Sequence, residues 1–175
     1  KKKGVVSGVR IRSVESLGPE ADVFLREMSE GFKVMHIRDH HYLNWRYVRN
    51  PLHHHAIFIA EEDERMVGLM VLRDEPDAIR RGTILEFFAY PEREDAQHLL
   101  LNQAGDYFRE RGVDVVIAWV FPHSPYYRAF RRHLFMRRQG DLIVLTTTTR
   151  ENDDLKNDLK NPLSWHVSCG DHEAF

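Results

Sequence analysis

The sequence predicts a mixed α/β fold with a largely antiparallel central sheet, one parallel β-α-β unit and flanking helices. Residues 83–90 are aromatic and β-rich, Pro91 ends this strand, and an apolar pattern with helical spacing follows. A second β-rich segment, 113–120, comes next, so we expect these two strands to be parallel with a right-handed crossover. The segments 56–61 and 65–73 flank an acidic turn and predict an antiparallel hairpin.

Bulk properties indicate one ordinary globular domain. The chain has 175 residues, of which 42% are hydrophobic, and this is enough for a real core. The net charge of −2 argues against a general nucleic-acid partner. The sequence has no long apolar run of membrane-spanning length and no visible signal peptide, and the single Cys169 excludes an intrachain disulfide. We therefore expect a cytoplasmic protein with neither a membrane nor a nucleic-acid partner.

The sequence before the β-α-β unit is expected to add one more strand and two helices. Residues 8–14 alternate between polar and apolar types, as a strand does. Pro19 is suited to open a short amphipathic helix, and Asp39 is suited to cap a second helix over 40–48. Residues 1–7 carry three consecutive lysines and are expected to form a solvated tail.

The sequence after the unit is expected to begin with a helix over 126–133. Ser124 is a suitable N-cap, and Pro125 suits the first helical position. Gly112 is expected to close the preceding helix. Three further features are predicted in order: a hairpin of 135–138 with 142–148, a loop or short surface helix over 150–161, and a strand with a turn over 164–171.

The unit over 83–112 resembles the central motif of the GNAT N-acetyltransferases in its strand, its Pro91, its Leu99–Leu100 pair and its terminal glycine. The resemblance covers residues 8–148 and implies a GNAT-like domain, with 149–175 as a C-terminal extension that packs on the same domain. It also implies an enzyme that uses acetyl-CoA or another acyl-CoA. The tail from Trp165 to Asp171 resembles one that some bacterial GNAT-like proteins carry after this domain.

The turn that holds the acetyl-CoA pyrophosphate in that family differs in this sequence. GNAT proteins place glycines there, whereas this chain has no glycine between Pro91 and Gly105. Glu92, Glu94 and Asp95 occupy the start of the helix, and Asp95 is a natural N-cap. Because carboxylates at a helix N-terminus satisfy its amides and repel anions, we expect a degenerate phosphate site.

The resemblance implies roles for individual residues. Glu86 is the candidate general base, because burial in an apolar strand raises a carboxyl pKa; the alternative is pairing with an arginine or an exposed edge position. The family tyrosine that protonates the departing CoA thiolate aligns with Phe130, and Tyr127, one turn earlier next to Tyr126, is the candidate replacement. Packing is the alternative role for both tyrosines. Cofactor contacts are expected from Phe88, Ala89, Tyr90, Arg93 and Ser124, and acceptor contacts from Tyr42, Trp45 and Trp119.

The histidine runs do not predict a metal site. Adjacent side chains of a strand point to opposite faces, so at most His53 and His55 can share a ligand sphere, and no carboxylate spacing supports them. The group of His36, His40 and His41 has equally weak geometry. No metal cofactor is therefore expected.

Two functional hypotheses from different classes remain open. The first is an acyl-CoA-dependent N-acyltransferase that acts on a small-molecule or peptide amine, with Arg93 and the basic segment 128–132 supplying positive charge. The second is a non-catalytic GNAT-shaped module that binds a small molecule or a protein partner. A third hypothesis, transfer from an aminoacyl-tRNA, is disfavoured by the mild acidity of the chain.

Overall fold

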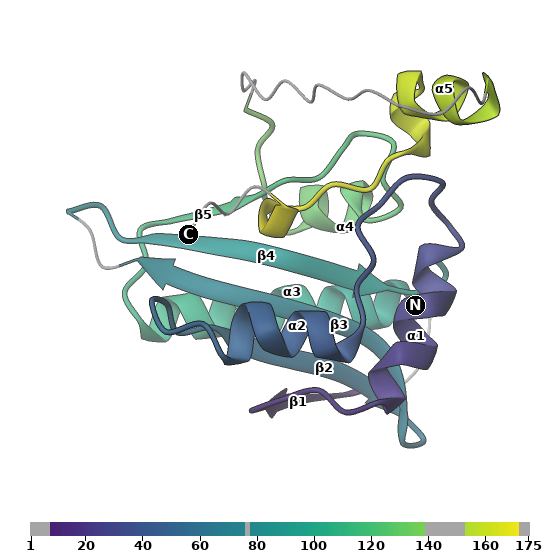
Figure 1. Cartoon of the computed structure of the whole chain (residues 1–175). Coiled ribbons are helices and arrows are strands. Elements are labelled where there is room, and N and C mark those ends of the chain that lie inside the picture. The colour runs from purple at the N-terminus through teal and green to yellow at the C-terminus, as the bar shows by residue number, and fades with distance from the viewer. Residues whose placement is uncertain (1–7, 76–77, 139–152, 172–175) are drawn as a thin grey trace, which may run out of the picture.

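The computed structural model describes residues 8–75, 78–138 and 153–171 (Figure 1). Five strands form one sheet in the order β1-β2-β3-β4-β5. Neighbouring strands are antiparallel except for β4 and β5, which are parallel. This arrangement confirms the predicted sheet and its β-α-β unit. The strands are β1 (Arg10–Val14), β2 (Ala56–Glu62), β3 (Arg65–Glu75), β4 (Arg81–Ala89) and β5 (Val115–Ala118).

Helices cover both faces of the sheet (Figure 1). One face packs against α1 (Glu20–Ser29) and α2 (His40–Leu43), which continues as a π-helical turn (Asn44–Val48). The other face packs against α3 (Glu94–Glu110) and α4 (Tyr127–Arg132). Because both faces are covered, the middle of β3 is a continuous apolar run, where a half-exposed strand would alternate.

The helix ends confirm two sequence predictions and contradict a third. The Asp39 carboxylate accepts a hydrogen bond from the Tyr42 N–H at 2.7 Å and caps α2. Gly112 has φ +63° directly after α3, the left-handed conformation that ends many helices. The prediction that Asp95 caps α3 is wrong, because the helix begins one residue earlier, at Glu94, and no side chain caps it.

The C-terminal part differs from its prediction. It contains α5 (Asp153–Lys160), one of the two forms expected for 150–161, and two 3₁₀ turns, η2 (Pro162–Ser164) and η3 (Cys169–Asp171). The strand predicted within 164–171 is wrong, because only a single bridge to Val34 forms there. This segment, residues 164–171, is called the C-terminal strap below. It lies beside β4 (Figure 1).

Three other predictions concern the ends of the chain and the helix expected over 126–133. That helix is α4, which begins at Tyr127 with Tyr126 at its N-cap position, so the prediction that Ser124 caps it with Pro125 at the first helical position is wrong. Ser124 Oγ accepts a hydrogen bond from the Tyr126 N–H at 3.3 Å, in the turn before the helix. The segment 135–138 adopts no strand, and its predicted partner 142–148 lies outside the described residues. The predicted tail, 1–7, also lies outside them.

The register between β3 and β4 shifts next to Glu86. Val71 lies opposite Glu86, whereas the following residue, Leu72, lies opposite Ile84, so Leu85 is an extra residue in β4. A bulge of this kind reverses the inward and outward alternation of the residues that follow it. Glu86 therefore faces the side of the sheet that α1 and α2 cover.

Candidate functional site

Glu86 lies at the centre of a buried hydrogen-bond network. Its Oε2 accepts from Arg38 Nε at 3.0 Å and from Ser168 Oγ at 2.9 Å, and its Oε1 accepts from Tyr47 Oη at 2.8 Å. Glu86 is 1% exposed and Arg38 is 5% exposed. Donors from three distant segments therefore satisfy a charge that would be very costly to bury alone.

Arg38 extends the network to the end of the described chain. Its Nη2 donates to Asp171 Oδ1 at 2.7 Å and to Ser168 Oγ at 3.1 Å. The Ser168 N–H donates to Asp171 Oδ2 at 2.8 Å. His36 Nδ1 lies 2.8 Å from Asp171 Oδ1 at the exposed margin. The C-terminal strap is thus fastened to β4 through one buried guanidinium.

Gly170 brings the strap backbone against the same carboxylate. A Cβ atom at this position would lie 2.2 Å from Tyr47 Oη and 2.6 Å from Glu86 Oε1, so only glycine fits. The Gly170 carbonyl oxygen accepts from Arg46 Nη2 at 2.5 Å. Both the backbone and the side chains of the strap therefore complete the network.

The two carboxyl groups of the network have pKa values shifted in opposite directions. Burial raises the pKa of Glu86 above its ordinary value, although Arg38 opposes this effect. Burial also pushes the pKa of Asp171 upward, but Arg38 and the Ser168 amide outweigh it, and the net shift is downward. Such divergence is typical of sites that move protons, since one group stays ionised while the other accepts a proton readily.

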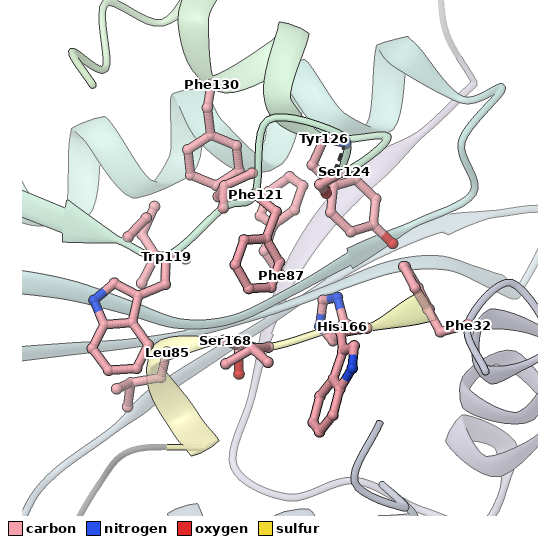
Figure 2. Close-up of a pocket in the computed structure, with 15 residues that line it drawn as sticks. Phe32, Leu85, Phe87, Trp119, Phe121, Ser124, Tyr126, Phe130, His166 and Ser168 are labelled. Atoms are coloured by element: carbon pink, nitrogen blue, oxygen red, sulfur yellow. Dashed lines mark hydrogen bonds between the residues drawn. The ribbon is translucent and has the colours of Figure 1, made fainter. Parts of the chain in front are cut away.

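A pocket lies where β4 and β5 separate. The two strands pair only from Arg81 to Ile84 and from Val115 to Ala118. Beyond them lies a space of about 400 Å³, part of it open to solvent, with the C-terminal strap as one wall (Figure 2). Aromatic side chains dominate the lining: Phe32, Phe87, Trp119, Phe121, Tyr126 and Phe130.

Few polar groups reach this pocket. Ser168 lines it and its hydroxyl donates to Glu86, so this residue connects the pocket to the buried network. Tyr126 lines it as well; burial raises the pKa of its hydroxyl, and a hydrogen bond from the Ala89 backbone partly offsets that rise. The other lining residues with hydrogen-bonding side chains are Ser124, His166 and the two tryptophans, Trp119 and Trp165. The pocket therefore combines apolar walls with a small set of oriented polar atoms, as ligand sites do.

The structure brings some predicted site residues to this pocket. Trp119 and Ser124 line it, whereas Tyr127 does not and its neighbour Tyr126 does. Phe88 and Ala89 are fully buried in β4; the Phe88 ring lies under the Arg38 guanidinium at 5.6 Å, on the face opposite that of Phe87.

Other predicted site residues lie apart from the pocket. Tyr42 and Trp45 contact each other, with ring centroids 5.9 Å apart, and Trp45 is 51% exposed. The Tyr90 hydroxyl bonds to Glu27, and its backbone carbonyl accepts from Gln97 Nε2. Both Tyr90 contacts are local to α1 and α3. Tyr42 lies closer to the Glu86 network: burial raises the pKa of its hydroxyl, and the charges of Arg38, Glu86 and Asp171 also act on that pKa.

The N-terminus of α3 has a different environment from the one expected. The Arg93 guanidinium donates hydrogen bonds to both Glu62 and Asp95, so its charge is already paired. A small hollow between α3 and α4 is lined by Glu94, Gln97, His98, Arg128 and Arg132, among others. Arg132 pairs with Glu94 at 2.7 Å, whereas Arg128 has no hydrogen-bond or ion-pair partner among the described residues. An uncapped helix end beside an available guanidinium suits an anion.

The comparisons with known proteins bear on the fold. The sequence matches no family model, and no curated protein sequence matches it significantly. Solved structures do match. A ribosomal-protein-alanine N-acetyltransferase from Brucella melitensis superposes with a TM-score of 0.58 at 14% identity, covering 79% of this chain and 99% of that chain.

Two further matches are acetyltransferases. A predicted acetyltransferase from Clostridium acetobutylicum, solved with acetyl-CoA, gives a TM-score of 0.53 at 15% identity, over 79% of this chain and 96% of that chain. An aminoglycoside acetyltransferase from a soil metagenomic sample, solved with sisomicin, gives 0.54 at 16% identity, over 81% and 97%. The chain has the GNAT acetyltransferase fold. The five-stranded sheet with its parallel β4–β5 pair matches that fold.

Sequence reasoning on this GNAT fold missed four residues of the network and its pocket: Arg38, His166, Ser168 and Asp171. Three of the four lie within the tail from Trp165 to Asp171, whose resemblance pointed to this segment without giving any of its residues a role. Arg38 lies in a loop with no periodic pattern, and only its contacts reveal it.

The described residues contain neither a cluster of metal-ligating side chains nor a helix that could span a membrane. No three histidine, cysteine, aspartate or glutamate side chains converge there as metal ligands. The rings of His53 and His55 stand 6.3 Å apart in an edge-on contact. Within the same ranges no helix has the length and apolar character needed to cross a bilayer.

Proposed function

We propose that this GNAT-fold chain transfers an acyl group from a CoA thioester to an amine, in the pocket between β4 and β5. The observation that carries the proposal is Ser168, a residue that lines that pocket and whose hydroxyl bonds to the buried Glu86. The fold likeness to an acetyltransferase solved with acetyl-CoA supports an acyl-CoA donor. The CoA thioester supplies the acyl carbon and a thiolate leaving group.

Glu86 and Ser168 are proposed to take up the proton that the amine loses. The Ser168 O–H donates to Glu86 Oε2, and Ser168 Oγ accepts from Arg38 Nη2. One oxygen lone pair remains for an amine N–H in the pocket. As the C–N bond forms, that proton passes to Ser168 while the Ser168 proton passes to Glu86. The raised pKa of Glu86 suits a group that accepts a proton near neutral pH.

Tyr126 is proposed to supply the proton that the leaving sulfur gains when the C–S bond breaks. It lines the pocket, no described residue accepts its O–H, and its raised pKa keeps it protonated. The sequence had favoured Tyr127 for this role. Tyr126 is the better candidate because it is the tyrosine that lines the pocket.

The phosphates of a CoA are proposed to lie between α3 and α4. The start of α3 has no side-chain cap, and Arg128 is available beside it. Glu94 and Asp95 weaken this site, but Arg132 and Arg93 pair with them and reduce the repulsion. The chain therefore offers charge to a phosphate without a glycine turn.

The first experiment is calorimetric titration with CoA and acetyl-CoA, followed by a thiol-release assay over a panel of amines. Glu86→Gln and Ser168→Ala are each expected to lower kcat by about a hundredfold or more, with little change in CoA affinity. Circular dichroism checks that both variants fold. Turnover unchanged in both variants would remove this pair from the mechanism.

The Glu86 environment also supports the second hypothesis, a non-catalytic module. Both carboxylate oxygens already have donors, so Glu86 is able to serve simply as the anchor of the C-terminal strap. In that case CoA fails to bind at millimolar concentration, and Glu86→Gln lowers the melting temperature without any activity to lose. The same titration and assay thus separate the two functions.

A further inference from the structure

His166 is a buried histidine whose Nε2 finds no hydrogen-bond partner among the described residues. It is 9% exposed, comes from the C-terminal strap, and lines the pocket between β4 and β5 (Figure 2). Its ring centroid lies 4.8 Å from that of Phe32 and 4.9 Å from that of Phe88. An unsatisfied polar atom in such surroundings costs stability, so its retention calls for a ligand that satisfies it.

The surroundings of His166 keep its imidazole neutral and hold its backbone in place. Burial lowers the pKa of His166 to about 4, with Arg38 acting in the same direction and Asp171 opposing it. The backbone N–H of His166 donates to the Val34 carbonyl oxygen at 3.0 Å, which holds this part of the strap. The imidazole therefore presents either an N–H or a lone pair at Nε2, depending on its tautomer.

We propose that the pocket binds an apolar group carrying one hydroxyl, and that His166 Nε2 pairs with that hydroxyl. The aromatic lining suits the apolar part. A hydroxyl is both a donor and an acceptor, so it satisfies either imidazole tautomer, whereas a carbonyl or an amide N–H satisfies only one.

The proposed function gives this group two sources. It belongs either to the acyl part of the thioester, as in a 3-hydroxyacyl group, or to the acceptor, as in an amino alcohol. Only this choice of source rests on the proposed function. The pairing with His166 itself rests on the pocket and its unsatisfied nitrogen.

Matched probes separate the sources. The donor arm titrates 3-hydroxybutyryl-CoA against butyryl-CoA, and the acceptor arm compares ethanolamine with ethylamine in the amine assay. A third arm needs no CoA: 3-hydroxybutyramide and butyramide are added to protein labelled with ¹⁵N-histidine, and the His166 ring nitrogens are followed by NMR. His166→Phe removes the nitrogens and keeps an aromatic ring, His166→Gln keeps one amide, and His54→Phe makes the same change at an exposed histidine as a control.

The hydroxylated member of one pair is expected to bind about tenfold more tightly in wild type and in His54→Phe. The preference should vanish in His166→Phe and survive in part in His166→Gln. A shift of the His166 nitrogens by the hydroxyamide, with no CoA binding at all, would support the pairing while refuting the acyltransferase. Equal binding within every pair, or an identical preference in His166→Phe, would overturn the inference even if CoA binds.

Discussion

Arg38 joins Glu86 in β4 to Asp171 in the C-terminal strap: Nε is 3.0 Å from Glu86 Oε2, and Nη2 is 2.7 Å from Asp171 Oδ1. The two carboxylates share one guanidinium that is almost fully buried. The wall of the pocket thus depends on a charge interaction with a loop far away in the sequence. This dependence can be measured.

Arg38→Met is expected to lower the free energy of unfolding by about 3–5 kcal/mol, because it leaves two buried carboxyl groups without their counter-charge. Urea denaturation measures the change. Arg12→Met is the matched control: Arg12 is exposed and pairs with Glu61 at 2.7 Å, so its loss should change the free energy of unfolding far less than the loss of Arg38. Equal effects of the two substitutions would argue against a buried network.

Gly170→Ala is expected to detach the strap from β4. The new Cβ would lie 2.2 Å from Tyr47 Oη, so either the strap or the tyrosine must move. Limited proteolysis should then cut the strap faster, and Tyr47→Phe in the same chain should restore part of the protection because it removes the clashing hydroxyl.

Gly105 lies within α3, and a Cβ atom added there would meet no other atom within 4 Å. Gly105→Ala is therefore expected to stabilise the protein by about 0.5–1 kcal/mol.

Arg128→Ala is expected to weaken CoA binding about tenfold while leaving the melting temperature unchanged, since Arg128 is exposed and has no partner among the described residues. Calorimetry at two salt concentrations should show a smaller salt dependence in the variant. Arg109→Ala serves as the control, because Arg109 is equally exposed but pairs with Asp106 on the far part of α3. If both variants bind CoA as wild type does, the phosphates lie elsewhere.

Acid is expected to destabilise the fold partly through His166. Its pKa is lowered from 6.5 to about 4, so between these pH values the unfolded chain binds a proton at His166 and the folded chain does not. The resulting stability is complete above pH 6.5 and is lost as the pH falls toward 4. In this window the free energy of unfolding changes by about 1.4 kcal/mol per pH unit for each such histidine.

His55, whose pKa is also lowered to about 4, contributes in the same window. His166→Phe should therefore lower the slope of the free energy of unfolding against pH by the contribution of one proton. The contribution of His55 should remain. Denaturation series at pH 4.5, 5.5 and 6.5 provide the test. An unchanged slope in the variant would show that His166 is protonated in the folded state.

The local elements of this protein follow from local patterns in the sequence. Pro91 and Gly112 flank the crossover helix closely because proline fixes φ and glycine tolerates the positive φ of a helix end, and neither effect needs a distant partner. Asp39 likewise caps α2 with its own side chain. The β2–β3 hairpin and the parallel β4–β5 pair were predictable because a short turn and a single crossover helix leave few topologies.

The candidate site was decided by tertiary structure. A one-residue bulge at Leu85 turned Glu86 toward α2, and alternation along the strand cannot show a bulge. The partners of Glu86 come from residues 48 positions before it and 82 positions after it, Arg38 and Ser168. The strap that brings Ser168 and His166 to the pocket is not a regular element, so periodicity does not predict its path. Its position follows from hydrogen bonds and burial that only the assembled sheet provides.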